Sequence, residues 1–88
     1  MMKGTGYTAR IKPTAEKEMN RLPASVFDRV ADVILQLESE PRPHGSQKLR
    51  GTEAYRVRVG SYRVLYTVDD GLRIVEIFSV GHRRDVYR

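Results

Sequence analysis

Hydrophobic and polar residues alternate along the last third of the chain. Three segments, residues 54–59, 62–69 and 72–80, carry apolar side chains at about every second position, and Gly60-Ser61 and Asp70-Gly71 separate them. Glycine at the first loop position suits a type II′ turn and Asp-Gly suits a type I′ turn, both of which join antiparallel strands through two residues. The pattern therefore predicts a three-stranded antiparallel meander.

Two-residue loops also fix which residues face each other. The expected partners are Val59–Tyr62, Arg58–Arg63 and Val57–Val64 at the first turn, then Val64–Ile77, Tyr66–Val75 and Arg63–Phe78 across the second. Side chains alternate between the two faces of a strand. The face expected to cover a core carries Tyr55, Val57, Val59, Tyr62, Val64, Tyr66, Val75 and Ile77. The opposite face carries Arg56, Arg58 and Arg63, with Leu65, Ile74, Glu76 and Phe78 beside them.

The pairing of Arg58 with Arg63 needs an explanation. Like charges directly opposite each other destabilise a sheet, so stability does not account for both. One interpretation is a solvated outer face on which the long side chains splay apart. The other is an anion site, because guanidinium groups match phosphate oxygens. The tail that follows, with His82, Arg83 and Tyr87, favours phosphate if it folds back onto this face.

The first half of the chain predicts a short strand and two helices. Residues 7–11 alternate like a strand whose neighbour the sequence does not identify. Pro13 suits the first position of a helix that Pro23 ends, and a second helix spans about 24–38. Its apolar stripe is Val26, Val30, Val33, Ile34 and Leu37. The short connection predicts an antiparallel helical hairpin that covers the apolar sheet face. The expected fold class is thus α+β, a small antiparallel sheet packed on a helical hairpin.

Composition limits the class of protein further. The 88 residues suit a single domain, they include no cysteine, and no apolar run is long enough to span a membrane. We therefore expect a cytoplasmic protein without a metal site. The net charge is +5, and residues 48–88 hold nine Lys and Arg against five acids, a net of +4. A polyanionic or acidic partner is expected near the meander.

Several short motifs resemble one toxin family. They are K-L-R-G at 48–51, Y-R-V-R-V at 55–59, Y-R-V-L-Y at 62–66, and V-G-H-R at 80–83 followed by Val86-Tyr87. Together they resemble the RelE family, the toxins of type II toxin–antitoxin pairs within the RelE/ParE superfamily, over essentially the whole chain, 1–88. The resemblance implies a ribonuclease that cuts messenger RNA in the ribosomal A site, without a metal or small-molecule cofactor. It also implies a RelB-like antitoxin, the ribosome and messenger RNA as partners.

The resemblance also implies roles for individual residues. The catalytic positions fall on Arg58, Arg63, Arg83 and Tyr87. Further RNA or phosphate contacts are expected from Lys48, Arg50, Arg56, His82 and Arg84. Well-studied bacterial members have lysines where this chain has Arg56 and Arg58. Because arginine stays protonated in proteins, neither residue can accept the proton of the attacking 2′-hydroxyl. That leaves Tyr87 or His82 as the general base, and we favour Tyr87.

Two other functions fit the same motifs. A ParE-like inhibitor of DNA gyrase shares this fold and cuts no RNA, and its terminal Tyr87 would be incidental. A decayed toxin would only bind its antitoxin. The sequence feature that favours the nuclease is the joint presence of Arg58, Arg63, Arg83 and Tyr87.

Overall fold

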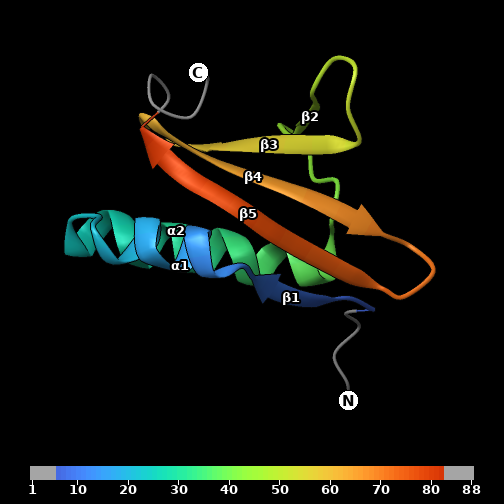
Figure 1. The fold of residues 1–88 in the computed structure, drawn as a ribbon, viewed down its shortest axis with the longest axis horizontal. Coiled ribbons are helices and arrows are strands. Elements are labelled where there is room, and N and C mark those ends of the chain that lie inside the picture. Colours follow the sequence, from blue (N-terminus) through green and yellow to red (C-terminus); the bar gives the residue numbers. More distant parts are fainter. Residues whose placement is uncertain (1–5, 83–88) are drawn as a thin grey trace.

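The computed structural model describes residues 6–82, in which two helices lie against one face of a mixed five-stranded sheet (Figure 1). In chain order the elements are β1 (Thr8–Ile11), α1 (Pro13–Asn20), α2 (Ala24–Ser39), β2 (Gln47–Lys48), β3 (Ala54–Val59), β4 (Tyr62–Asp69) and β5 (Ile74–His82). The strands lie in the order β1-β5-β4-β3-β2. The expected α+β class is confirmed. No helix of the described part of the chain is long and apolar enough to cross a membrane.

The core lies between the helical hairpin and the predicted apolar face. The helices contribute Ala15, Met19, Val30, Ile34 and Leu37, and the sheet contributes Val59, Val64, Tyr66, Val75, Ile77 and Val80. Tyr66 is completely buried, and its hydroxyl donates a 2.8 Å hydrogen bond to the carbonyl oxygen of Pro41. Such a partner is required because a buried hydroxyl without one is costly. The bond also holds the segment after α2 against the sheet.

Strand β1 makes the sheet mixed. It runs parallel to β5, with Thr8 beside Ile74 and Ile11 beside Ile77, so the expectation of a wholly antiparallel sheet is wrong at this strand. The α1–α2 hairpin lies between β1 and the meander in the chain. The chain that connects β1 to the meander therefore crosses the apolar face of the sheet, as a connection between parallel strands requires. The free edge of β1 is covered where Ala9 N–H donates a 2.7 Å hydrogen bond to Glu38 Oε2.

The first turn follows the prediction. Val57 pairs with Val64, Arg58 with Arg63 and Val59 with Tyr62 across a two-residue loop. Gly60 has a φ of +61°, the left-handed region that glycine enters at little cost. The residues of this turn are therefore sufficient to determine the pairing of β3 with β4.

The second turn differs from the prediction. Asp69 pairs with Ile74, so the loop holds four residues, and Tyr66 faces Ile77 where Val75 was expected. The left-handed residue is Arg73, with φ +60°, and not Gly71. The Asp69 carboxylate accepts the Leu72 N–H at 2.9 Å, which stabilises the longer loop. The Arg73 carbonyl accepts the N–H of Thr8 at 2.9 Å, and this bond connects the loop to β1.

An irregularity in β5 shifts the register again. Leu65 pairs with Ser79 while Tyr66 pairs with Ile77, so Phe78 has no partner in β4. Arg63 consequently faces Gly81, and the expected pair of Arg63 with Phe78 is wrong. A bulge of this kind bends a strand and increases its twist. It brings Val80 opposite Val64, both buried in the core.

A polar clasp joins three distant segments at the four-residue turn. Arg42 donates to both carboxylate oxygens of Asp70, at 3.3 and 2.9 Å, and to the Tyr55 hydroxyl at 3.0 Å. The Tyr7 hydroxyl donates to Asp70 Oδ1 at 2.6 Å. The bonds from Arg42 and then Tyr7 lower the pKa of the Asp70 carboxyl. The clasp explains why Asp70 does not sit in a tight Asp-Gly turn.

This clasp predicts a pH dependence of stability. Because the pKa of Asp70 is lower in the folded chain, its contribution is present above the unfolded pKa of about 3.9 and is lost as the pH falls through the folded value. Asp70→Asn should therefore be less stable than the wild type near neutral pH, and the difference should shrink in acid. Urea unfolding of both proteins at neutral and at acidic pH measures it. A difference that stays constant or grows in acid would contradict this assignment.

Candidate functional site

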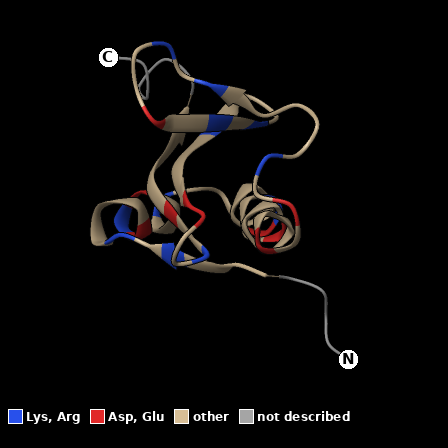
Figure 2. Ribbon diagram, turned by 90° about the vertical axis from the view of Figure 1, so that its right-hand side faces the viewer, with Lys and Arg blue, Asp and Glu red and all other residues tan. Residues whose placement is uncertain are grey.

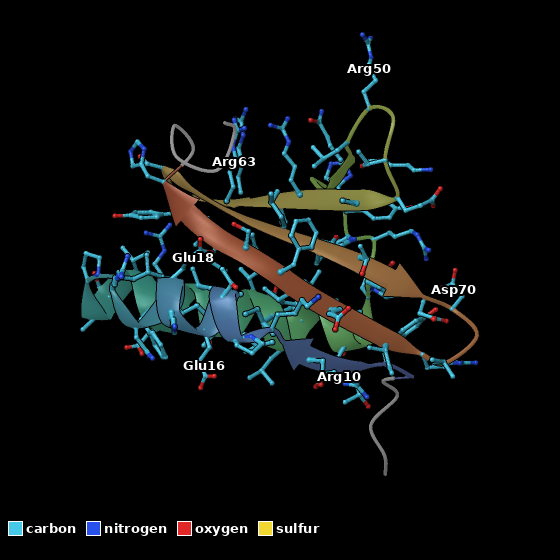
Figure 3. All side chains as sticks on the ribbon, in the orientation of Figure 1. Arg10, Glu16, Glu18, Arg50, Arg63 and Asp70 are labelled. Atoms are coloured by element: carbon cyan, nitrogen blue, oxygen red, sulfur yellow. The ribbon has the colours of Figure 1, made fainter. Side chains whose placement is uncertain are left out.

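Three arginines share the face of the sheet that the helices leave open. Arg56 and Arg58 are alternate residues of β3, and Arg58 pairs directly with Arg63 of β4. Val57 and Val64, one position away, point into the space beneath the helices. Figure 3 shows Arg63 on the side of the sheet away from α1 and α2. The structure thus brings together the three arginines that the register predicted, which we call the arginine face.

The three arginines differ in burial. Arg58 is exposed and Arg56 is half-buried, with its Nη2 bonded to the side-chain oxygen of Gln47 on β2. Arg63 is only 5% exposed, although it lies on the outer face. A fully solvated outer face with splayed side chains is therefore not what the structure shows. A buried guanidinium is costly unless it is bonded, and it is positioned more rigidly than a surface one. This arrangement suits a fixed anion-binding group.

The basic residues continue onto the loop between β2 and β3. Lys48 ends β2 and lies 3.9 Å from Glu53, a distant and exposed ion pair. Arg50 extends from the loop away from the helices, on the same side as Arg63 (Figure 3). Figure 2 shows Lys and Arg on β3 and on this loop, at the opposite end of the molecule from the helices. Arg50 therefore lies beyond the edge of the arginine face, whereas Lys48 pairs with Tyr55 and has its side chain on the opposite face of the sheet.

His82 lies at the end of β5, on the face of the sheet opposite the arginine face. It is the last residue of β5 and pairs with Tyr62 of β4. The two rings meet edge to face, with centroids 5.5 Å apart. Arg83, Arg84 and Tyr87 follow His82 in the sequence. These three predicted site residues lie outside the described part of the chain.

Glu18 is a residue of this region that the sequence did not indicate. Its Oε1 accepts the backbone N–H of Val80 at 2.8 Å and the Ser79 hydroxyl at 3.2 Å. Figure 3 shows Glu18 between α1 and β5. The contact holds the end of β5 just after the bulge, beyond the part that β1 covers. No local pattern signals it, because the partners are more than sixty residues apart in the chain.

Removing the Glu18 carboxylate should loosen this end of the sheet. Hydrogen bonds to charged groups contribute about 1.5–3 kcal/mol, and Glu18 is half-buried. We expect Glu18→Ala to lower the free energy of unfolding by about 1–2 kcal/mol. Glu18→Gln, which keeps an acceptor oxygen, should cost less. Urea denaturation measures both. Equal stability of Glu18→Ala and the wild type would show that the contact contributes nothing.

The site offers cationic phosphate-binding chemistry. Within residues 6–82, no three His, Asp or Glu side chains gather in a way that could hold a metal ion. The described residues of the arginine face supply guanidinium groups, which bind phosphate oxygens and stabilise added negative charge.

Comparison with known proteins identifies the class. The family model described as the ParE toxin of a type II toxin–antitoxin system matches residues 9–87. The chain is therefore a toxin of the type II toxin–antitoxin class. The toxin RelG of Mycobacterium tuberculosis is 36% identical over 93% of this chain and 97% of its own length. The putative toxin RelE1 of Methanocaldococcus jannaschii is 30% identical over 93% of this chain and 96% of its own.

Solved structures agree with this result. The RelBE2 toxin–antitoxin complex of M. tuberculosis matches with a TM-score of 0.80 and 32% identity, over 89% of this chain and 99% of that one. The archaeal RelE–RelB complex of Pyrococcus horikoshii matches with a TM-score of 0.79 and 31% identity, over 89% and 96%. The chain belongs to the RelE family of toxins within the RelE/ParE superfamily, as its motifs predicted.

Proposed function

We propose that this toxin is a ribosome-dependent endonuclease that cleaves messenger RNA in the A site. The observation that carries the proposal is the arginine face itself. Arg58 and Arg63 lie directly opposite each other on a face that the core does not need. Such a pair costs stability, and a bound phosphate between the two guanidinium groups would offset that cost.

The proposed reaction transfers a phosphoryl group within the RNA. The 2′-oxygen attacks the adjacent phosphorus and the bond from phosphorus to the 5′-oxygen breaks. The products are a 2′,3′-cyclic phosphate and a free 5′-hydroxyl. Arg58 and Arg63 hold the phosphate oxygens and stabilise the charge that develops on them. Tyr87, as the phenolate, takes the proton from the 2′-hydroxyl. Arg83 stabilises the negative charge on the departing 5′-oxygen, which takes its proton from water to become the 5′-hydroxyl.

A second candidate is inhibition of DNA gyrase without RNA cleavage. It is favoured by one observation, the match of residues 9–87 to the ParE family model. Mapping new 5′ ends of messenger RNA after a short induction, beside a gyrase supercoiling assay, separates the two. The endonuclease yields new 5′-hydroxyl ends within codons and leaves supercoiling unchanged. Inhibited supercoiling with intact messages would instead establish the gyrase inhibitor.

The proposed partner in the resting cell is a RelB-like antitoxin. Two of the similar solved structures are complexes of a toxin with an antitoxin. On this chain the outer face combines Arg58 with apolar side chains near the second turn, where Leu72 is 70% exposed and Ile74 lies beside it. A basic face with apolar positions suits an amphipathic acidic helix. We therefore place the antitoxin over this face.

Charge reversal tests the placement of the antitoxin. Arg58→Glu should weaken the complex with the protein encoded beside the toxin by at least about tenfold, or about 1.4 kcal/mol. Lys17→Glu, on exposed α1, makes the same charge change on the helical side and should have little effect. Titration calorimetry measures both affinities. A larger loss for Lys17→Glu would place the antitoxin on the helices.

A further inference from the structure

A pocket of about 360 Å³ opens on the helical side of the sheet, between α1 and the end of β5. Its lining includes Arg21, Tyr62, Gly81 and His82. A volume above about 300 Å³ is in the range of small-ligand sites. Arg56, Arg58 and Arg63 do not line this pocket, which lies on the other side of the sheet; His82 is the one residue with a predicted role that does.

One arginine, Arg21, lines the pocket, and a second, Arg29, lies outside its lining beside the neighbouring β3–β4 turn. Arg21 follows α1 and is exposed, and neither of the two ion pairs among residues 6–82 includes it. Arg29 of α2 is also exposed, and a methyl group placed on Gly60 would lie 3.3 Å from its Nη2. Its guanidinium therefore lies beside the β3–β4 turn, two residues from Tyr62. Glu18 also lines the pocket, where its Oε1 accepts hydrogen bonds from Ser79 and Val80, so the phosphates are expected on the arginine side of the pocket, away from this carboxylate.

The pocket adjoins the arginine face across the end of the sheet. Tyr62 and Arg63 are consecutive residues of β4, so their side chains point to opposite faces. Tyr62 and His82 form the last pair of β4 and β5. An RNA strand that passes from Arg63 around this end of the sheet would therefore reach Tyr62 first and Arg21 next.

We infer that the pocket binds a nucleotide of the RNA that flanks the one held on the arginine face. An aromatic ring beside cationic side chains is the usual combination for single-stranded nucleic acid, with the base on the ring and the phosphate on the cations. Tyr62 takes the base, and Arg21 and Arg29 take the phosphates. The inference rests on the proposed function, since it extends the path of the same RNA.

Salt dependence of RNA binding tests the inference without requiring cleavage. The probe is a fluorescent single-stranded RNA of about 12 nucleotides, a length within the span of known single-strand sites. It carries 2′-O-methyl groups so that it cannot be cut. Fluorescence anisotropy gives its Kd at several salt concentrations between about 50 and 200 mM. Circular dichroism and thermal unfolding establish that each variant is folded.

Each phosphate contact contributes about 0.7 to the slope of log K against log salt for a single strand. Arg21→Gln and Arg29→Gln should each lower the slope by about that amount. Tyr62→Leu should weaken binding by at least about fivefold with the slope unchanged, because stacking carries no charge. The matched control is Lys12→Gln, at the opposite end of α1, which should leave the slope unchanged.

The outcomes separate this inference from the proposed function. The inference that the pocket binds RNA is wrong if the slopes stay unchanged in Arg21→Gln and Arg29→Gln. It is also wrong if the slope falls equally in Lys12→Gln. It is also overturned if these variants weaken only the antitoxin complex, which would make the pocket a protein-binding site. If the slopes change as expected while the wild type cuts no message on ribosomes, the pocket stands and the endonuclease proposal fails.

Discussion

Arg83→Ala and Arg63→Ala should each abolish growth inhibition. Each removes a guanidinium that would stabilise charge on the phosphate, and loss of one such donor typically costs about 10²–10³-fold in rate. We therefore expect single-turnover cleavage on programmed ribosomes to fall by at least about 100-fold. Arg58→Ala, which truncates the exposed partner of Arg63, should also lower the cleavage rate.

Folding must be measured beside activity in these variants. Arg63 is buried, so its truncation leaves space in the sheet while it also relieves repulsion from Arg58. Arg63→Gln keeps most of the side-chain volume and removes the guanidinium, which makes it the matched variant. It should unfold cooperatively in urea and remain inactive. A fully toxic variant, or one that is inactive only because it does not fold, would contradict the role of Arg63.

Tyr87→Phe should reduce the single-turnover cleavage rate by at least about tenfold. General-base catalysis contributes about 10²–10⁴-fold, and tenfold is a cautious lower limit. The substitution keeps the ring, and with it any stacking on a base, and removes only the hydroxyl. Neither Arg56 nor Arg58 can replace it, because arginine does not release its proton in proteins.

His82→Gln is the comparison that makes the Tyr87 result decisive. The His82 ring packs against Tyr62 at the end of β5, and glutamine preserves a polar side chain there. We expect a much smaller loss of rate than for Tyr87→Phe. The reverse order would assign the base to His82. Near-normal rates in both variants would mean that the arginines act almost entirely by positioning the phosphate.

The elements that depend on local rules were predictable from the sequence. The Gly60-Ser61 turn, the pairing of Arg58 with Arg63 and the buried stripe of α2 follow from turn chemistry and periodicity alone. The second turn could not be predicted, because Asp70 accepts hydrogen bonds from Arg42 and Tyr7, which are distant in the chain. The unpaired Phe78 then displaced Arg63 from its expected neighbour.

The candidate site was predictable to a similar degree. The alternation of side chains and the register of the first turn placed Arg56, Arg58 and Arg63 on one face, and the structure confirms that face. The burial of Arg63 could not be read from alternation, which assigns a face but not the depth at which a side chain lies. Glu18 and Arg21 could not be predicted as part of this region, because they reach it only through the packing of α1 beside the end of β5.

The central claim is that the RNA supplies its own nucleophile while the arginine face holds the phosphate. The most direct test compares two messages on programmed ribosomes that differ in one atom, the 2′-oxygen of the nucleotide at the cleaved position. We expect the purified toxin to cut the ordinary message, leaving a 2′,3′-cyclic phosphate and a 5′-hydroxyl, and to leave the 2′-deoxy message intact. Cleavage of both messages, or of neither, would contradict the account.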